Sequence, residues 1–393
     1  RDQPRSRGLG DVYKRQDLSR ETKMKVAHIS SSGKLDGGAE LCLVSLIRYE
    51  IENGINPYVL LPYKGELQEK LNSMGVENDI IHYLPWRHHR SEPKLKSSAI
   101  FLIKIVINLI QEVHIYRLLR KHKVDLVHIN TTAVYAGSIS AHILNTPLIW
   151  HLREFNGQPT SYDFYCKSFS YRLLSRASKC IAVSKVMDDF YSEHLNNSIV
   201  IYDSMEEPRH ERQSDLFSSD ITKIILIGNK KPDKGQMDAI KALSQLRDLP
   251  IHLTLIGKDM DEAYVAEMHD YTQKHSLASL LTDNSFDSKA KFKLLESDIA
   301  LNCSRSESFG RTTVEALMSG CLVIGNNNSC TAELLANGRG LLYEGSEDLS
   351  VKIRWAINHP AESKDIAKKG VEFGVGSFQT GNKNIVNLFK SML

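Results

Sequence analysis

Short runs of β-branched and other apolar residues alternate with longer amphipathic stretches from Met24 onwards. Short apolar runs bounded by turn residues predict buried strands, and the longer periodic stretches predict helices. The strands predicted in the first half are Lys25–Ser30, Tyr58–Pro62, Asp79–Tyr83, Leu126–Asn130, Leu148–His151, Cys180–Ser184 and Ile199–Tyr202. The helices predicted between them are Glu40–Glu52, Glu66–Met74, Ser97–Lys121 and Tyr162–Ser175.

The same alternation returns in the second half, after a polar segment at residues 204–220 that predicts a linker. The strands predicted there are Lys223–Ile227, Ile251–Ile256, Ile299–Cys303 and Leu322–Gly325. The helices predicted there are Lys234–Arg247, Asp261–His275, Lys289–Glu296, Gly310–Ser319 and Thr331–Ala336. A terminal helix is predicted over 378–393, and packing back on the first half is one of the placements that its pattern allows.

Continuous apolar strands separated by helices are typical of parallel sheets that are covered on both faces. The sequence therefore predicts an α/β fold of two doubly wound, Rossmann-like domains, at residues 24–203 and 221–377, which face each other across a cleft. Ligands of such sheets bind outside the carboxyl ends of the strands, so the cleft between the domains is the predicted site.

Composition excludes several classes of protein. The chain has 393 residues, of which 41% are hydrophobic and 25% charged, and this rules out collagen, coiled coil and wholesale disorder. Residues 1–16 account for the whole net charge of +3, so the neutral remainder argues against nucleic-acid binding. Gly8–Gln16 resemble a translated sequencing-adaptor scar, and residues 1–23 lack the apolar centre of a signal peptide. We expect Met24 to be the native start and 1–23 to be a tail outside the fold.

Cysteine spacing and hydropathy bear on the compartment. The six cysteines show no metal-binding spacing, which favours free thiols in a reducing cytoplasm. The segment 97–121 is apolar on much of its surface and then basic. The favoured interpretation is a core helix with a basic last turn, and the alternative is docking at the inner face of a membrane. Its longest apolar stretch, Ala99–Ile110, is broken by Lys104 and is shorter than the ~20 residues of a membrane span.

Several familiar motifs are missing. No G-x-G-x-x-G follows a predicted strand and no G-x-S-x-G is present, which removes the main support for a dinucleotide-dependent dehydrogenase or a serine hydrolase. Asp259-Met-Asp261 is a D-x-D triplet, which can hold a metal beside a nucleotide. We favour a solvated helix start for it.

The most informative stretch is Ser304–Gly320, in which seven residues separate Glu307 from Glu315. Glu307 follows a predicted strand, and Glu315 falls in the second turn of the next predicted helix. The helix N-terminus between them, at Gly310, Arg311 and Thr312, offers free backbone N–H groups and the positive end of the helix dipole to an anion. For the two glutamates alone, an acidic capping pattern is the favoured interpretation.

Together with five other segments, this stretch resembles the E-x7-E element of the retaining family 4 glycosyltransferases of GT-B architecture. The other segments are Gly37-Gly38-Ala39-Glu40, the WHLRE stretch at 150–154, Ile181–Ser184, Lys234-Gly235 and Thr331–Leu334. They occur in the family's order, and the resemblance extends over nearly all of residues 24–393.

The resemblance implies roles for single residues. Glu307 would orient the transferred sugar, His151 would lie near its anomeric centre, and Glu315 would accept hydrogen bonds from the ribose hydroxyls. The remaining donor-binding residues that it implies are Gly37, Gly38, Lys234, Phe309, Gly310, Arg311 and Thr312. Because fixed positive charge would neutralise the leaving diphosphate, we expect no obligatory metal and no cofactor.

The implied activity is a retaining hexosyltransferase that takes a sugar from a nucleotide-diphosphate donor. The acceptor would be a saccharide or lipid-linked, in the synthesis of a cell-surface polysaccharide. One departure is Asn229, where many members carry an arginine; Lys230, Lys231 or Arg311 are candidates for the second cation. Two alternatives stay open: an inactive GT-B partner protein, and a nucleotide-sugar epimerase or phosphorylase-like enzyme on the same fold.

Overall fold

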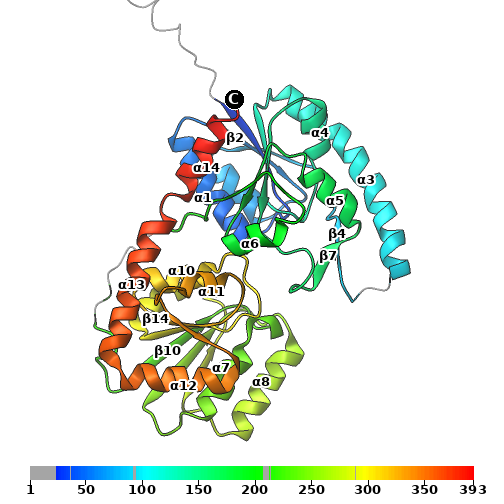
Figure 1. Ribbon diagram of the computed structural model, residues 1–393. Helices are drawn as coiled ribbons and strands as arrows, with labels where there is room; N and C mark the ends of the chain where they lie inside the picture. The colour runs from blue at the N-terminus through cyan, green and yellow to red at the C-terminus, as the bar shows by residue number, and fades with distance from the viewer. Residues whose placement is uncertain (1–23, 36, 92–93, 207–211, 213, 288) are drawn as a thin grey trace, which may run out of the picture.

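The computed structural model describes residues 24–35, 37–91, 94–206, 212, 214–287 and 289–393. The predicted tail at 1–23 and residues 207–211 and 213 of the predicted linker lie outside the described residues. The described chain forms two α/β domains, each built on a parallel sheet with helices on its faces (Figure 1). The prediction of two Rossmann-like domains is confirmed.

The first sheet has seven parallel strands in the order β3-β2-β1-β5-β6-β8-β9. They are β1 (Lys25–Ile29), β2 (Asn56–Leu61), β3 (Glu77–Ile80), β5 (Leu126–Ile129), β6 (Leu148–Leu152), β8 (Lys179–Ala182) and β9 (Ser198–Val200). Its helices are α1 (Gly38–Glu52), α2 (Glu66–Ser73), α3 (Lys94–Lys121), α4 (Ser138–Ile143), α5 (Lys167–Leu174) and α6 (Lys185–Tyr191). Strands β5 and β6 are buried along their whole length, as expected for a sheet covered on both faces.

The second sheet has six parallel strands in the order β12-β11-β10-β13-β14-β15. They are β10 (Thr222–Ile227), β11 (Ile251–Ile256), β12 (Leu281–Asn284), β13 (Ile299–Asn302), β14 (Leu322–Asn326) and β15 (Leu341–Tyr343). Its helices are the 3-10 turns η1 (Pro232–Lys234) and η2 (Leu294–Glu296), α7 (Gln236–Ser244), α8 (Glu262–Lys274), α9 (Ala290–Lys293), α10 (Arg311–Met318), α11 (Ser329–Leu335), α12 (Gly345–Asn358) and α13 (Pro360–Phe378). The carboxyl ends of β10 and β13, where the strand order reverses, carry the loops that face the first domain.

The last helix returns to the first domain. Helix α13 runs along the second domain, and α14 (Gly381–Lys390) packs against α1 (Figure 1). Ile385 and Phe389 are buried in the same core cluster as Val26 of β1. The turn between α13 and α14 needs a glycine, because a Cβ on Gly381 would lie 2.1 Å from the carbonyl oxygen of Tyr202.

The helix predicted over Tyr162–Ser175 is wrong at its start. Tyr162–Phe164 form strand β7, which pairs antiparallel with β4 (Arg87–His89) in a separate ribbon. Helix α5 begins only at Lys167. The aromatic residues of β7 pack well on a pleated, half-buried surface, with Phe164 against Trp86, and this tertiary contact overrides the helical pattern.

The interpretation of 97–121 as an ordinary core helix is wrong for one face of α3. The opposite face packs on the first domain through Ile115 and Leu119, which are buried. Six apolar side chains are instead 48% to 65% exposed, namely Leu102, Ile103, Val106, Leu109, Ile110 and Val113. Ala99–Lys121 is long and apolar enough to cross a membrane by length and composition, and 17% of its most apolar window is buried. The apolar surface of α3 is therefore wider than the part of it that neighbouring elements cover.

Candidate functional site

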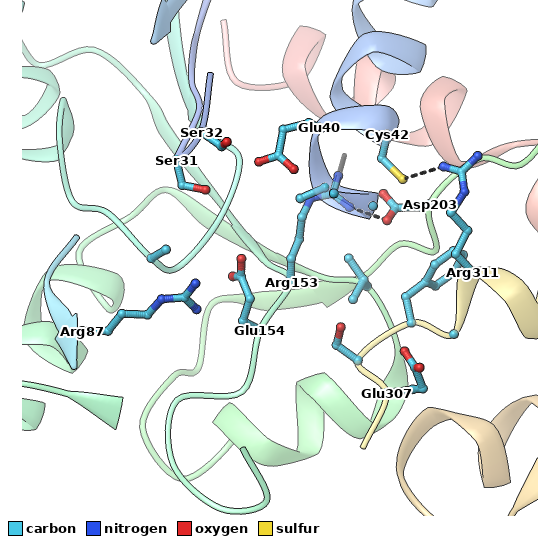
Figure 2. A pocket seen from close by; sticks show the side chains of 18 of the residues that line it. Ser31, Ser32, Glu40, Cys42, Arg87, Arg153, Glu154, Asp203, Glu307 and Arg311 are labelled. Atoms are coloured by element: carbon cyan, nitrogen blue, oxygen red, sulfur yellow. Dashed lines mark hydrogen bonds and ion pairs between the residues drawn. The ribbon is translucent and has the colours of Figure 1, made fainter. Parts of the chain in front are cut away.

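A cavity of about 500 Å³ lies between the two domains. The first domain contributes the N-terminus of α1 and the residues that follow β6 and β9, and the second contributes the loop between β13 and α10. Figure 2 shows Arg153 and Asp203 on the first-domain side, with Glu307 and Arg311 across from them. The predicted interdomain site therefore exists as a cavity with charged groups on both walls.

The second-domain wall is built at the start of α10. Phe309, Gly310 and Arg311 line the cavity, and the free N–H groups of the first helical turn open towards it. Gly310 has φ +76°, a left-handed conformation that turns the chain from the β13 loop into the helix. The predicted anion-binding terminus thus faces the cleft.

Lys234 and Glu307 form an ion pair on this wall. The Nζ atom of Lys234 lies 2.5 Å from Oε1 of Glu307. Burial lowers the pKa of Lys234, but the Glu307 carboxylate outweighs this and leaves the pKa above its ordinary value. Gly235, at φ +68°, lets the lysine loop approach β13 closely, since a Cβ there would lie 2.1 Å from the carbonyl oxygen of Cys303. Lys234 and Glu307 also line a smaller cavity with Thr312.

Of the three candidates for a second cation, Arg311 occupies the cleft. Its Nε lies 3.1 Å from Oε1 of Glu315, and Nη1 contacts Sγ of Cys42 in the other domain at 3.7 Å. Lys230 is tied to Asp259 and Asp283 at 2.9 and 2.5 Å with 4% of its side chain exposed. The other candidate, Lys231, pairs with Asp233 at the surface. Of the three candidates, Arg311 at the start of α10 is therefore the one that lines the cleft.

The D-x-D triplet has the structural role that the sequence favours. Asp261 is the N-cap of α8 and accepts a hydrogen bond from the backbone N–H of Tyr264. Within the described parts of the chain, no group of three or more His, Cys, Asp or Glu side chains is arranged to hold a metal ion.

On the first-domain wall, Gly37 and Gly38 line the cavity at the N-terminus of α1, as the glycine loop predicts. His151 is different: it is completely buried within β6, behind Arg153. Its implied contact with the sugar stays a prediction. The cleft-facing groups of this segment are Arg153 and Glu154.

The sequence analysis missed the buried pair of Arg153 and Asp203, whose exposed fractions are 6% and 4%. Burial lowers the pKa of Arg153, but Asp203 outweighs burial and raises it. Burial, followed by Asp203, raises the pKa of Cys42 to about 12, so this cavity-lining thiol is protonated at neutral pH. Arg153 directly follows the buried strand β6, and that position was the available signal; Asp203 lies three residues after β9.

The segment Thr331–Leu334 joins the two domains. Glu333 accepts hydrogen bonds from the backbone N–H groups of Lys185 and Val186, at 3.2 and 3.1 Å, and from the hydroxyl of Tyr202. Ser184 Oγ donates to the carbonyl oxygen of Ser308 at 2.6 Å. These contacts hold the edges of the cleft together.

Two family models match adjoining parts of the chain. Residues 36–202 match the model of Glycosyltransferase Family 4, and residues 208–373 match the model of Glycosyl transferases group 1. A comparison with curated proteins gives no match.

Solved structures share the fold. HepE of Anabaena in complex with UDP has a TM-score of 0.76 at 21% identity, over 94% of this chain and 100% of that chain. A glycosyltransferase from Rickettsia africae has a TM-score of 0.75 at 16% identity, over 94% and 98%. The apo form of WaaB, a lipopolysaccharide outer core galactosyltransferase, has a TM-score of 0.71 at 14% identity, over 94% and 100%.

Proposed function

Because its two halves match these models, the chain belongs to the family 4 glycosyltransferases of GT-B type, and we propose that it transfers a hexose with retention of configuration. The donor would be a nucleotide-diphosphate sugar, and the acceptor a saccharide or a lipid-linked molecule of a cell-surface polysaccharide pathway. The observation that carries the proposal is the grouping of Glu307, Arg311 and the α10 N-terminus on one wall of the interdomain cavity, with Lys234 paired to Glu307 from the smaller cavity that Glu307 also lines.

The chemistry follows from these charges. The bond between the anomeric carbon and the diphosphate oxygen breaks, and the acceptor oxygen bonds to the same face of that carbon. The acceptor proton passes to the leaving phosphate oxygen. Lys234, Arg311 and the α10 N–H groups would stabilise the negative charge that develops on the diphosphate. Fixed cations of this kind support our proposal that the reaction needs no metal.

Glu307 has to change partners in this scheme. In the structure its carboxylate is bound to Lys234 at 2.5 Å. When the diphosphate binds Lys234 in place of Glu307, the Glu307 carboxylate becomes free to accept hydrogen bonds from hydroxyls of the sugar. The pair would thereby hold both charges in place until the donor arrives.

Thermal unfolding with UDP, GDP, ADP or NAD, each with and without EDTA, tests the donor site. HepE has been crystallised with UDP and with UDP-glucose, so UDP is the first ligand to try. A bound ligand at 100 times its Kd adds ~2.7 kcal/mol of stability. We expect one nucleoside diphosphate to stabilise the protein in EDTA, and Glu315→Ala to weaken that effect.

Glu372→Ala is the matched control, because Glu372 is exposed on α13 of the same domain. If no nucleotide stabilises the wild type, the proposal fails and an inactive partner protein takes its place. Turnover of UDP-glucose to another nucleotide sugar with no acceptor present would instead show an epimerase.

The exposed face of α3 supports a membrane-bound site of action. Its six exposed apolar side chains lie on the helix whose C-terminal turn carries the exposed cations Arg117, Arg120 and Lys121. An apolar helix face that ends in basic residues matches the surface of an anionic bilayer. We therefore place the enzyme in the cytoplasm, at the inner face of the membrane, within this proposal.

Co-sedimentation with vesicles of phosphatidylcholine, with and without phosphatidylglycerol, tests this docking. We expect binding to the anionic vesicles and its loss in a Val106→Ser, Leu109→Ser variant. A Val351→Ser variant is the control, since Val351 is 60% exposed on the other domain. Equal binding of all three proteins, or of none, would overturn the assignment of this surface.

A further inference from the structure

Three histidines form a row inside the first domain, directly behind the cleft. His28 on β1, His128 on β5 and His151 on β6 are all completely buried, and their strands are neighbours in the sheet. His28 Nδ1 lies 2.9 Å from His128 Nδ1, and His128 Nε2 lies 3.2 Å from His151 Nδ1. At the far end His28 Nε2 lies 2.9 Å from Oε2 of Glu50, which is also fully buried.

The near end of the row reaches the wall of the cleft. Nη2 of Arg153 lies 3.4 Å from Nδ1 of His151, and Oδ1 of Asp203 lies 4.0 Å from His151 Nε2. Arg153 and Asp203 both line the cavity and pair with each other. Helix α14 covers the row with the ring of Phe389, whose centroid lies 5.5 Å from that of His128. The row thus connects a carboxylate on α1 to a charged pair at the site.

The contacts of His151 fix where its proton sits. An arginine donates hydrogen bonds and cannot accept them, so the lone pair of His151 has to be on Nδ1 and its proton on Nε2. The Nε2–H then points towards the Asp203 carboxylate. The opposite tautomer would set an N–H against the Arg153 guanidinium and a lone pair against Asp203, and both interactions are repulsive.

The direction of every other hydrogen bond in the row follows. His128 donates from Nε2 to His151, so a neutral His128 accepts at Nδ1 from the Nδ1–H of His28. The contact between His28 Nε2 and Glu50 Oε2 then needs one more proton, which is held between the two groups. Burial, with positive charge on His28 and Arg153, lowers the pKa of His128 well below its usual range, and this keeps the extra proton at the Glu50 end.

We propose that Glu50, His28 and His128 are positioning residues that hold His151 in its Nε2–H form and thereby fix Arg153 and Asp203 at the cleft wall. Arg153 is held from three sides, by His151, by Asn130 and by Asp203. The orientation of Arg153 towards a ligand in the cavity then depends on the proton between His28 and Glu50. The rings of His151 and His128 separate that proton from Arg153. The effect on turnover rests on the proposed function, and the arrangement of protons does not.

Nitrogen-15 NMR of the histidine rings in the full chain at neutral pH tests the proton arrangement. We expect His128 and His151 to be protonated at Nε2 alone, and His28 to carry a proton on Nδ1. Single His→Gln variants assign the signals. A His151 ring protonated at Nδ1, or a His28 ring without a proton on Nδ1, would overturn the inference without reference to any activity.

Two variants of Glu50 test the positioning role. The amide of Glu50→Gln donates to His28 Nε2 and preserves the direction of the row, so we expect wild-type tautomers of His128 and His151 and nearly wild-type UDP-glucose turnover. Glu50→Leu removes the partner and leaves His28 Nε2 unpaired. We expect its kcat to fall by about 10-fold or more, as for other residues that orient a functional group. Stabilisation by UDP should persist, since the charged donor-binding residues Lys234, Arg311 and Glu315 lie in the other domain.

Glu112→Leu is the matched control, because it removes another buried carboxylate of the first domain that has no contact with the row. It should leave the His151 signal unchanged. Wild-type turnover and tautomers in Glu50→Leu would overturn the positioning role. If Glu50→Leu does not fold, the wild-type spectrum and Glu50→Gln still decide. If the wild type does not turn over UDP-glucose, the donor assignment fails and the NMR result stands separately.

Discussion

The two domains share an architecture but hold their cleft charges in different ways. In the first domain, Arg153 and Asp203 are 6% and 4% exposed and are braced from behind by His151. In the second, the pair of Lys234 and Glu307 is 25% and 16% exposed, and Arg311 and Glu315 are 34% and 22% exposed. The ion pair on the first-domain wall is therefore fixed in place. We expect the ion pairs on the second-domain wall to open, so that their charges bind a ligand instead of each other.

The difference has a structural origin. Arg153 directly follows β6 and Asp203 lies three residues after β9, and both side chains are buried. The second-domain charges lie on η1, on the β13 loop and on the first turns of α10, which water reaches. A partly exposed ion pair costs less free energy to open than a buried one, because a buried charge that loses its partner is left without compensation. We therefore expect the second-domain wall to rearrange its ion pairs when a donor binds, and the first-domain wall to keep its ion pair.

The largest loss of stability is expected when the buried ion pair of Arg153 and Asp203 is broken. Asp203→Ala leaves the Arg153 charge buried without its carboxylate, and we expect a loss of ~3–5 kcal/mol in the free energy of unfolding. The matched change Glu315→Ala in the second domain should cost ~0.2–1 kcal/mol, because its pair is partly exposed. Urea unfolding of both variants measures the contrast. Equal losses would show that the two walls are held alike.

Glu307→Gln tests the adaptable wall through activity. The amide keeps the shape of the side chain but loses the charge that orients the sugar and balances Lys234. We expect kcat with a UDP-sugar and its acceptor to fall by about 100-fold, the scale for loss of a group that acts in the transition state. Stabilisation by UDP should remain. A variant with wild-type kcat would remove Glu307 from the reaction.

Lys234→Ala tests the same wall through affinity. It removes a charge-assisted hydrogen bond to the diphosphate and leaves Glu307 to repel it, so we expect the Kd for UDP to rise by about 10-fold or more. Calorimetry gives the Kd. Lys231→Ala is the control, since Lys231 is 40% exposed and pairs with Asp233 away from the cleft. A similar change in both variants would point to long-range charge and away from contact.

The features that could be predicted from the sequence depend on residues that are close together in the chain. The first sheet and four strands of the second could be read from apolar runs, whereas the short strands β12 and β15 were missed. The anion-binding terminus of α10 could be read from a strand, a loop and a helix that are contiguous over 299–320. It could not reveal the histidine row, because His28 and His128 are 100 residues apart and meet only through the register of β1 with β5. Buried polar networks depend on strand order, which no local pattern encodes.

Helix α3 shows a second limit of the pattern. A helix that is apolar on most of its circumference is typical of a core position. Its burial, however, depends on how many neighbours surround it, and α3 lies at the edge of the first domain, where one face is left open (Figure 1). The number of tertiary neighbours is a property of the assembled fold.

The smallest expected effect is a dependence of stability on pH that arises from a buried carboxyl group of the first domain. Burial raises the pKa of Glu112 on α3 to about 7, against hydrogen bonds from Ser140 and Gly137 that favour its charged form. Since the folded state binds this proton more tightly than the unfolded state, stability falls as pH rises from about 4.5 to 7. Between pH 5.5 and 7.5 we expect this group to account for ~1 kcal/mol, discounted for those hydrogen bonds. Glu112→Gln should lower the free energy of unfolding at both pH values and reduce its decline between them, measured by urea unfolding. An unchanged decline would assign the pH dependence to other groups, with the buried histidines of the same domain next to be tested.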